Sequence, residues 1–181
     1  MKRHPFLIGS RIILRPLTEA DCAGRYPQWL NDAEVCRHNG HHVVPYSAEA
    51  ARAYVRSVSR SPSDLVLAIV AKRANRHIGN IALQQIDMVN RSAELAILVG
   101  EKAYWGKGYA TEACRLLLEH AFGTMNLHRV GCGTSQHHTA MQRLAETVGM
   151  RPEGRRRRAL FKQHCYIDLI EYGVLQEEYR R

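Results

Sequence analysis

Membrane-spanning and secretory segments are missing from this sequence of 181 residues. No apolar stretch approaches the roughly 20 consecutive residues that a helix needs to cross a bilayer. Residues 1–6 are basic, but they lack the long apolar core and the small-residue cleavage site of a signal peptide. We therefore expect a cytoplasmic protein without a membrane partner.

Paired cysteines are missing as well. The cysteines are odd in number, widely spaced and form no C-x-x-C motif: Cys22, Cys36, Cys114, Cys132 and Cys165. This pattern argues against a zinc site and against a disulfide framework, and it suits a reducing compartment. Cys114 falls on the apolar stripe of a predicted helix and Cys132 in a predicted strand, so we expect buried structural roles for both.

Acidic residues are scarce relative to basic ones: 17 Asp and Glu stand against 26 Lys and Arg, a net charge of +9. Such a balance suits an anionic partner, which could be nucleic acid, an acidic protein surface or a phosphorylated cofactor. No nucleic-acid-binding motif accompanies the charge, so nucleic acid is disfavoured. The densest cluster is residues 155–158, four arginines. We interpret it as a solvated turn, with contacts to phosphates or to an acidic acceptor as the alternative.

Linkers, repeats and low-complexity segments are absent too, so we predict one domain over residues 1–181. Strands are expected at residues 11–15, 65–71, 77–86, 93–99, 129–134, 158–161 and 166–175. Helices are expected from Thr18 to about Leu30 with an interruption at Pro27, from Ser47 to Ser59, and over residues 108–125. A fourth helix begins with a capping box of Thr139 and Gln142. Alternating strands and helices indicate an α/β layer fold.

Two glycines separate the apolar strand at residues 95–99 from the long helix. Gly106 and Gly108 have no Cβ, so the main chain can turn sharply and approach a ligand closely. A strand, a glycine turn and a helix N-terminus in this order form a cradle of backbone N–H groups for phosphate. The spacing fits neither G-x-G-x-x-G nor G-x-x-x-x-G-K-[ST], and a plain tight turn explains the two glycines equally well.

The segment from Trp105 to Ala113, WGKGYATEA, resembles the acetyl-CoA-binding motif of the GNAT N-acetyltransferases. It is most similar to the branch with the RimJ/RimL ribosomal-protein and spermidine acetyltransferases, although Trp105 stands where the family usually has Gln or Arg. Further similar segments follow in the family's order from about residue 11 to residue 179: residues 15–21, 29–35, 127–130, 148–150 and 166–179.

This resemblance implies a GNAT-type α/β fold: a mixed, mostly antiparallel central sheet of about seven strands, flanked by about four helices and splayed between strands four and five. Pantetheine would enter the splay and pair with the main chain of Ile97, Leu98 and Val99. The cosubstrate would be acetyl-CoA, with no metal. The resemblance assigns these further residues to the cofactor: Trp105, Gly106, Lys107, Gly108, Tyr109, Ala110, Thr111 and His138.

A general base is implied at Glu94, where relatives often carry a carboxylate facing the acceptor pocket. Partial burial would raise its pKa and let it take the amine proton, directly or through water. The alternative is a half-exposed strand-end glutamate paired with an arginine such as Arg91.

The general acid is where the chain departs from its relatives. Counting back from Gly149, the tyrosine that often protonates the thiolate aligns with Ala145, which has no proton to give. The asparagine that touches the pantetheine arm aligns with His138. Tyr166 and His138 are the candidate replacements, and solvent is the alternative donor. His138 is otherwise interpreted as part of an exposed loop.

A second histidine cluster lies in residues 37–42. Metal binding is disfavoured, because adjacent histidines in a glycine loop lack the i, i+4 spacing of a helical site. A specificity loop beside the acceptor or a plain solvated loop remain as interpretations.

We therefore expect transfer of an acetyl group from acetyl-CoA to a primary amine, by direct attack in a ternary complex. The acceptor could be a protein N-terminus, such as that of a ribosomal protein, or a small amine, and a homodimer is left open. The alternatives are a CoA-binding module without catalysis, suggested by Ala145, and an acetyltransferase for an amino sugar or a polyamine. Net positive charge disfavours a polyamine unless the pocket is locally acidic.

Overall fold

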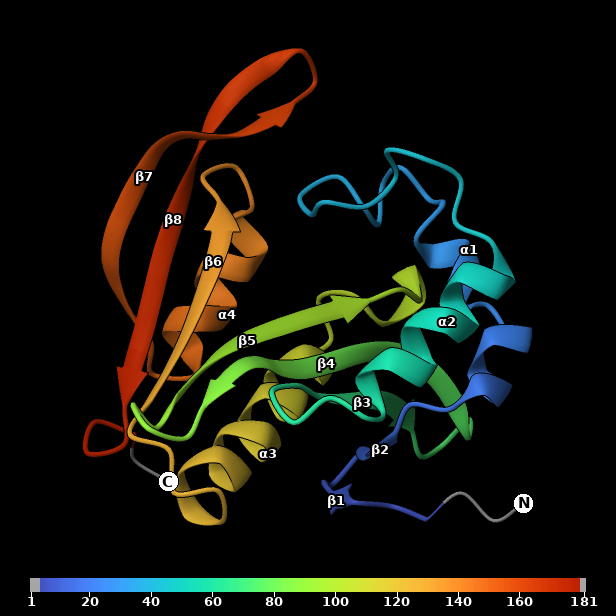
Figure 1. The fold of residues 1–181 in the computed structure, drawn as a ribbon, viewed down its shortest axis with the longest axis horizontal. Helices are drawn as coiled ribbons and strands as arrows, with labels where there is room; N and C mark the ends of the chain where they lie inside the picture. Colours follow the sequence, from blue (N-terminus) through green and yellow to red (C-terminus); the bar gives the residue numbers. More distant parts are fainter. Residues whose placement is uncertain (1–3, 180–181) are drawn as a thin grey trace.

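The computed structural model describes residues 4–179, so the first three residues of the basic N-terminal segment lie outside it. Its sheet has eight strands in the order β1-β2-β3-β4-β5-β6-β8-β7 (Figure 1). The strands are β1 (Leu7–Ile8), β2 (Ile12–Pro16), β3 (Leu65–Ala71), β4 (Arg76–Asp87), β5 (Ser92–Val99), β6 (Arg129–Ser135), β7 (Arg151–Lys162) and β8 (Cys165–Leu175). The two-residue β1 is the strand beyond the seven expected.

Every neighbouring pair is antiparallel except β5 and β6, which run parallel. Their pairing ends at Glu94 and Gly131, after which the two strands diverge (Figure 1). The expected splay between the fourth and fifth predicted strands is therefore confirmed. It lies between β5 and β6 because β1 shifts the numbering.

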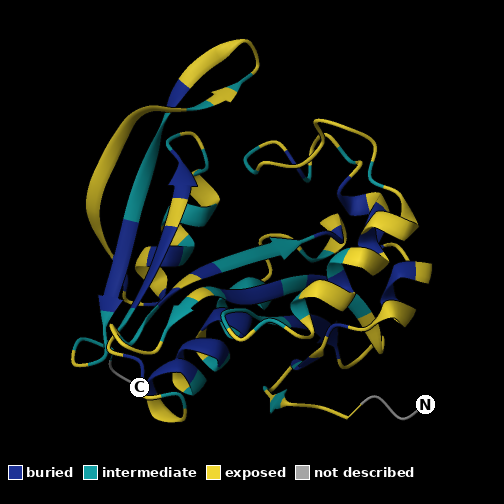
Figure 2. Cartoon of the chain, viewed as in Figure 1, coloured by how far each residue is buried: buried dark blue, intermediate teal, exposed yellow. Residues whose placement is uncertain are grey.

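The two faces of the sheet are covered unequally. Helices α3 (Tyr109–Gly123) and α4 (Thr139–Thr147) pack on one face around a core that runs from Ile12 to Val174. On the other face, the 3-10 helix η1 (Glu19–Ala23), α1 (Tyr26–Trp29) and α2 (Ala48–Val58) pack over Ala68 of β3 and beside Leu98 of β5. Figure 2 shows the result: the middle strands are buried, whereas β7 is exposed along its length. On this second face, η1, α1 and α2 cover β3 and reach β5, and they leave β6, β7 and β8 uncovered.

Two expected helix starts behave differently. Ser47 caps α2, since its Oγ accepts a hydrogen bond from the backbone N–H of Ala50 at 3.1 Å. The capping box of Thr139 and Gln142 is wrong, because Thr139 is already the first residue of α4 and His138 holds the cap position. The Gln142 amide instead donates to the main-chain carbonyls of Ser135 and Gln136, at 3.2 and 2.9 Å.

The first predicted helix is divided into two short segments. Thr18 precedes η1 as expected, and its N–H donates to Asp21 Oδ2 at 2.9 Å. The chain then breaks at Gly24, and Pro27 falls in the first turn of α1, where a missing N–H costs least.

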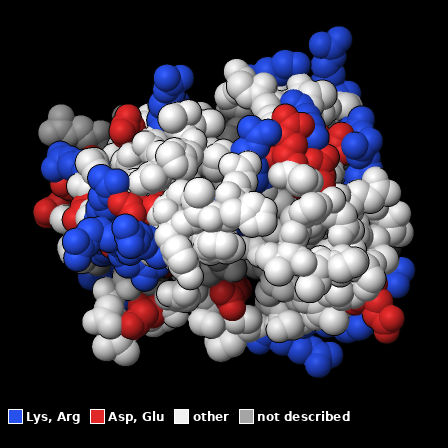
Figure 3. Space-filling model, turned by 90° about the horizontal axis from the view of Figure 1, so that it is seen from above, with Lys and Arg blue, Asp and Glu red and all other residues white. Residues whose placement is uncertain are grey.

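The arginines of residues 155–158 are not a turn. They lie within β7, where Arg155 and Arg156 pair with residues of β8, and the ladder shifts register between Arg156 and Leu160. Arg158 at this irregularity has φ of +53°. Figure 3 shows a group of basic side chains on the side of the molecule where β7 lies. Four consecutive arginines show no alternation of apolar and polar residues, so the local sequence indicated a turn. Pairing with β8 makes this segment a strand.

Candidate functional site

The splay leaves one edge of β5 without a strand neighbour. Beyond Glu94, residues 95–99 pair with β4 alone. The end of this edge is held by Trp105, whose indole Nε1 donates to the carbonyl of Val99 at 2.7 Å. Residues Ile97, Leu98 and Val99 are half-buried beside this gap, so the structure places them where a ligand can approach their main chain.

The glycine loop carries free backbone donors. Gly106 and Gly108 have φ of +66° and +78°, conformations that favour glycine over any residue with a Cβ. The first intrahelical bond of α3 runs from the N–H of Glu112 to the carbonyl of Gly108 at 3.1 Å. The N–H groups of Tyr109, Ala110 and Thr111 therefore point out of the helix start, where an anion is favoured by hydrogen bonds and by the helix dipole.

Lys107 is exposed, but its side chain and its main chain both form hydrogen bonds. Its Nζ donates to the carbonyl of Ala103 at 2.7 Å, and its own carbonyl accepts from Arg11 Nη1 at 2.8 Å. The loop is thus tied to the preceding turn η2 (Lys102–Tyr104) and to the start of β2.

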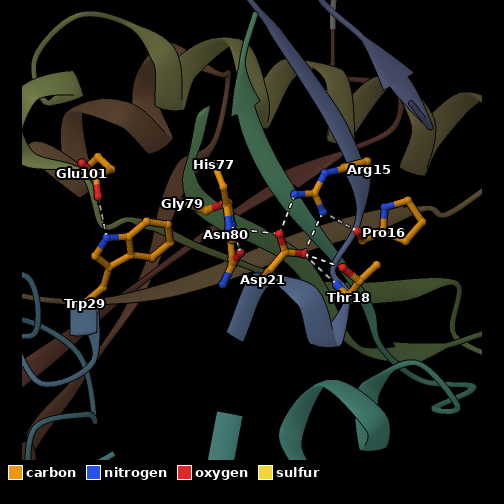
Figure 4. A network of polar contacts seen from close by, with 9 residues as sticks. All are labelled: Arg15, Pro16, Thr18, Asp21, Trp29, His77, Gly79, Asn80 and Glu101. Atoms are coloured by element: carbon orange, nitrogen blue, oxygen red, sulfur yellow. Dashed lines mark hydrogen bonds and ion pairs between the residues drawn. The ribbon is translucent and has the colours of Figure 1, made fainter. Parts of the chain in front are cut away.

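A buried network anchors the end of β5 behind the loop (Figure 4). Glu101 is 5% exposed and accepts a hydrogen bond from Trp29 Nε1 at 3.0 Å. Arg25 and Arg76 pair with the same carboxylate at 2.7 and 2.9 Å. Gly100 gives room for the Trp29 ring, since a Cβ there would lie 1.9 Å from it. These contacts with Trp29, Arg25 and Arg76 therefore hold in place the turn that leads into the glycine loop.

The same network continues to a buried ion pair. Both Nη atoms of Arg15 donate to Asp21, at 2.8 and 2.6 Å, and both side chains are almost fully buried. Burial alone would raise the pKa of Asp21, but Arg15 and the hydrogen bonds from Thr18 lower it to about 2. His77 lies 3.6 Å from the same carboxylate and hydrogen-bonds to Gly79 and Asn80 (Figure 4). This network is structural.

Glu94 lies at the opening of the splay, on the open face of the sheet. Its side chain is directed over Gly131, because a Cβ on that glycine would lie 2.7 Å from Glu94 Oε1. A cavity of about 390 Å³ opens there. It is lined by Gln85, Glu94, Arg129, Cys132, Gly133, Glu153, Arg156, Leu169, Glu171 and Tyr172.

Three carboxylates line this cavity, those of Glu94, Glu153 and Glu171. Among residues 4–179, Glu94 is the one of the three that forms no ion pair. Arg129 binds both oxygens of Glu153, and Arg156 pairs with Glu171 at 3.3 Å. Arg91 is not the partner of Glu94, since it bonds to Asn126 at 2.7 and 2.8 Å. Partial burial raises the pKa of Glu94, and Arg129 opposes that shift.

Arg129 and the other two glutamates of the cavity were not found from the sequence, and Arg156 was noticed only as part of the arginine cluster at residues 155–158. They come from β6, β7 and β8, and the charged positions of these strands show no motif. Strand pairing brings Arg129 and Glu153 together over Gly173, where a Cβ would lie 2.4 Å from the Glu153 carboxylate. A charged residue opposite a glycine on the neighbouring strand is the signal that could have indicated them.

His138 at the start of α4 meets the histidine loop. Its ring stacks on that of His38, with centroids 4.4 Å apart and planes 15° from parallel. Its Nδ1 lies 3.3 Å from Thr134 Oγ1. Burial, helped by His38, lowers the pKa of His138 to about 4, so at neutral pH the imidazole is uncharged. It can then hydrogen-bond to a ligand but has no spare proton for a thiolate.

The histidine loop is also fastened to the long hairpin, since Lys162 Nζ donates to the carbonyl of Asn39. Figure 1 shows the loop and the β7–β8 hairpin approaching one another beyond the end of the sheet. The contacts of Lys162 with Asn39 and of His138 with His38 thus join the histidine loop to the β7–β8 hairpin and to the start of α4. Arg37, Gly40, His41 and His42 remain exposed, so the loop is solvated apart from these contacts of His38 and Asn39.

Neither the position of the missing tyrosine nor the candidate Tyr166 offers an acid beside Glu94. Ala145 is 1% exposed in the core, so nothing reactive replaces the missing tyrosine there. Tyr166 is 67% exposed near the hairpin tip, where its ring packs against Phe161 at 5.0 Å. Along β8, at about 3.3 Å per residue, it lies about 23 Å from Gly173, which stands beside Gly131. The structure does not bring Tyr166 to Glu94.

Of the two cysteines assigned buried roles, Cys132 lines the Glu94 cavity. Cys114 and Cys132 are buried as expected, and burial raises the pKa of Cys132 to about 12. Within residues 4–179, no group of three or more His, Cys, Asp or Glu is arranged to hold a metal ion. In the same part of the chain, no helix is both long and apolar enough to cross a membrane.

Comparison with known proteins bears on this geometry. The profile of the family described as Acetyltransferase (GNAT) domain matches residues 11–151. The "Putative ribosomal N-acetyltransferase YdaF" of Bacillus subtilis (strain 168) is 34% identical over 101 residues, which are 56% of this chain and 55% of that protein. The chain thus spans about half the length of that relative. The Spermidine N(1)-acetyltransferase of Escherichia coli (strain K12) is 28% identical over 170 residues, 92% of this chain and 87% of that protein.

Solved structures agree on the fold. Mycobacterium smegmatis RimJ in complex with CoA-disulfide matches with a TM-score of 0.86 at 19% identity, over 98% of this chain and 90% of that one. At this identity the likeness concerns the fold alone. With the family profile covering well over half of the sequence, the chain belongs to the GNAT acetyltransferase family.

Proposed function

We propose that this protein transfers the acetyl group of acetyl-CoA to a primary amine by direct attack in a ternary complex, with Glu94 as the general base. One observation carries the proposal. Glu94 is a carboxylate without an ion-pair partner among the described residues, in a cavity that opens where β5 and β6 diverge. An ammonium group is the natural occupant of such a position.

The residues present fit the donor. Pantetheine would pair with the free edge of Ile97, Leu98 and Val99, and the pyrophosphate would take the N–H groups that follow Gly108. His138, uncharged and half-buried at the start of α4, would hydrogen-bond to the pantetheine arm. When bound, acetyl-CoA supplies the activated acyl group. Tyr109, Ala110 and Thr111 would supply the N–H groups for the pyrophosphate, whereas Trp105, Gly106 and Lys107 would hold the loop in shape.

The chemistry divides into proton removal, attack and departure. Glu94 takes a proton from the acceptor ammonium, and its raised pKa makes it a better base than an ordinary carboxylate. The amine nitrogen then bonds to the thioester carbon and loses its second proton to water, and the carbon–sulfur bond breaks as the carbonyl re-forms. The departing thiolate takes its proton from water, because Ala145 has none and Tyr166 stands far from Glu94.

The cavity selects a cationic acceptor. Three carboxylates line it against two guanidinium groups, so it is locally acidic although the chain as a whole is basic. A protein N-terminus, as the YdaF relative suggests, and a small amine, as the spermidine relative suggests, both satisfy this chemistry. The net positive charge of the chain therefore no longer argues against a polyamine acceptor. An amino sugar remains a further alternative. We place this activity in the cytoplasm, in one catalytic domain over residues 1–181.

A thiol-release assay across a panel of amines tests the proposal. The panel contains peptides with free N-termini, spermidine, an amino sugar and a lysine derivative, and product masses confirm the added acetyl group. Release of CoA with at least one amine, abolished by blocking that amine, supports the proposal. The second candidate is a CoA-binding module without catalysis, favoured by the buried Ala145. Tight CoA binding with no thiol release on any amine would support it instead.

A further inference from the structure

A contact between the start of β2 and the start of α3 borders the glycine loop. Glu112 accepts hydrogen bonds from the N–H of Arg11 at 2.8 Å, from Arg11 Nε at 3.0 Å and from Ser10 Oγ at 3.2 Å. Arg11 Nη1 continues to the carbonyl of Lys107 at 2.8 Å, and the guanidinium lies 4.7 Å from the centre of the Tyr109 ring. We call Arg11 and Glu112, with these contacts, the clasp.

The chain is shaped to admit the clasp. A Cβ on Gly9 would lie 2.4 Å from Glu112 Oε1, so this turn accepts the carboxylate because it has no side chain. A Cβ on Gly108 would lie 3.2 Å from Arg11 Nη2, which brings the guanidinium to the glycine that opens α3. The Glu112 side chain is 15% exposed, whereas that of Arg11 is 48% exposed beside the loop.

The clasp neutralises a negative charge beside the proposed pyrophosphate site. Glu112 is the acidic residue of the first turn of α3, next to the N–H groups proposed for the pyrophosphate. Burial would raise the pKa of Glu112, but the hydrogen bonds from Arg11 and Ser10 outweigh it and lower the pKa, so the carboxylate is ionised. An unneutralised anion there would repel the phosphates, because like charges at close range repel one another.

The Lys107 carbonyl raises the same problem for the loop. A carbonyl oxygen turned toward the phosphates would repel them and remove the adjacent N–H from the cradle. Arg11 Nη1 holds that oxygen on the side of β2. One side chain therefore controls both the charge and the orientation of the donors.

We propose that Arg11 is a positioning residue for the donor: it neutralises Glu112 and holds the Lys107 carbonyl so that the loop accepts the pyrophosphate of acetyl-CoA. This inference rests on the proposed function. It adds a residue about 100 positions from the glycine motif, outside the segments that the motif itself identifies.

CoA binding by isothermal titration calorimetry tests the proposal with R11M, E112Q and the double variant. R11M leaves the Glu112 charge facing the loop, so we expect affinity to fall about tenfold, the size of about 1.4 kcal/mol. The double variant should recover much of that loss, since the charge that Arg11 neutralised is gone. R56M is the matched control, because Arg56 forms an exposed ion pair with Glu19 away from the loop. Thermal unfolding checks that each variant is folded.

The outcomes separate the two proposals. Unchanged CoA affinity in R11M, or a double variant no tighter than R11M, would overturn the role of Arg11. A merely structural contact would lower the unfolding temperature in R11M and the double variant alike without this recovery. If the unaltered protein bound no CoA at all, the proposed function itself would fail, and the role of Arg11 with it.

Discussion

The carboxylate of Glu94 lies over Gly131, in space that the side chain of any other residue at position 131 would fill. We expect Gly131→Ala to displace this carboxylate, because the added Cβ would lie 2.7 Å from Oε1. A misplaced base costs on the order of 100-fold in rate. Steady-state kinetics should show a lower kcat with unchanged CoA affinity. Gly40→Ala is the control, since a Cβ there meets no atom within 4 Å. Equal rates in both variants would contradict the placement of Glu94.

Replacing the base itself should change the pH profile. We expect Glu94→Gln to lower kcat by about 100-fold near neutral pH, within the range of general base catalysis. The deficit should shrink at high pH, because the acceptor amine then arrives already deprotonated. Glu119→Gln, on the exposed side of α3, serves as the control. A small deficit of equal size at every pH would show that Glu94 is not the base.

Charge and backbone strain can be separated at Gly108. With φ of +78°, any other residue there is strained, by about 1–2 kcal/mol. Gly108→Ala and Gly108→Glu share this strain and a Cβ contact of 3.2 Å with Arg11 Nη2, and Gly108→Glu alone adds a negative charge at the phosphate cradle. We expect the glutamate variant to bind CoA at least about tenfold more weakly than the alanine variant. Calorimetric affinities measure the difference, and equal affinities would argue against a phosphate site in this loop.

The buried pair of Arg15 and Asp21 should dominate stability under acid conditions. Its folded pKa of about 2 is depressed, so the stabilisation is present above pH about 4 and is lost as pH falls toward 2. Asp21→Ala leaves Arg15 buried without its partner, which should cost about 3–5 kcal/mol. Urea unfolding at pH 7 measures this loss. Glu19→Gln, which breaks an exposed pair, should cost less than about 1 kcal/mol, and a similar cost for both would refute the difference.

The ring of His138 should titrate far below an ordinary histidine. Its folded pKa of about 4 is depressed, so between pH about 6.5 and 4 the unfolded chain binds more protons. Stability therefore falls as pH is lowered through that window. Imidazole chemical shifts measured against pH should give a midpoint near 4. In His38→Ala the midpoint should rise, because burial and the neighbouring ring both decrease. A midpoint near 6.5 in the unaltered protein would contradict the stacked arrangement.

Local features were predictable and distant contacts were not. Gly106 and Gly108 could be assigned to a turn before α3 because positive φ is a property of single residues. The stacking of His38 on His138 joins segments about 100 residues apart, and no spacing in the sequence encodes it. The arginines of β7 were misassigned for a related reason, since only pairing with β8 makes that segment a strand. The neighbours of Glu94 in the cavity depend on such pairing throughout, whereas Glu94 itself was proposed from the resemblance to a family.

A crystal structure with bound CoA tests the central claim most directly. The account predicts the pantetheine arm between β5 and β6, hydrogen-bonded to the edge at residues 97–99, with the pyrophosphate on the N–H groups after Gly108. The thiol should then lie at the opening beside the Glu94 cavity. CoA bound elsewhere, or with its thiol directed away from Glu94, would contradict the account.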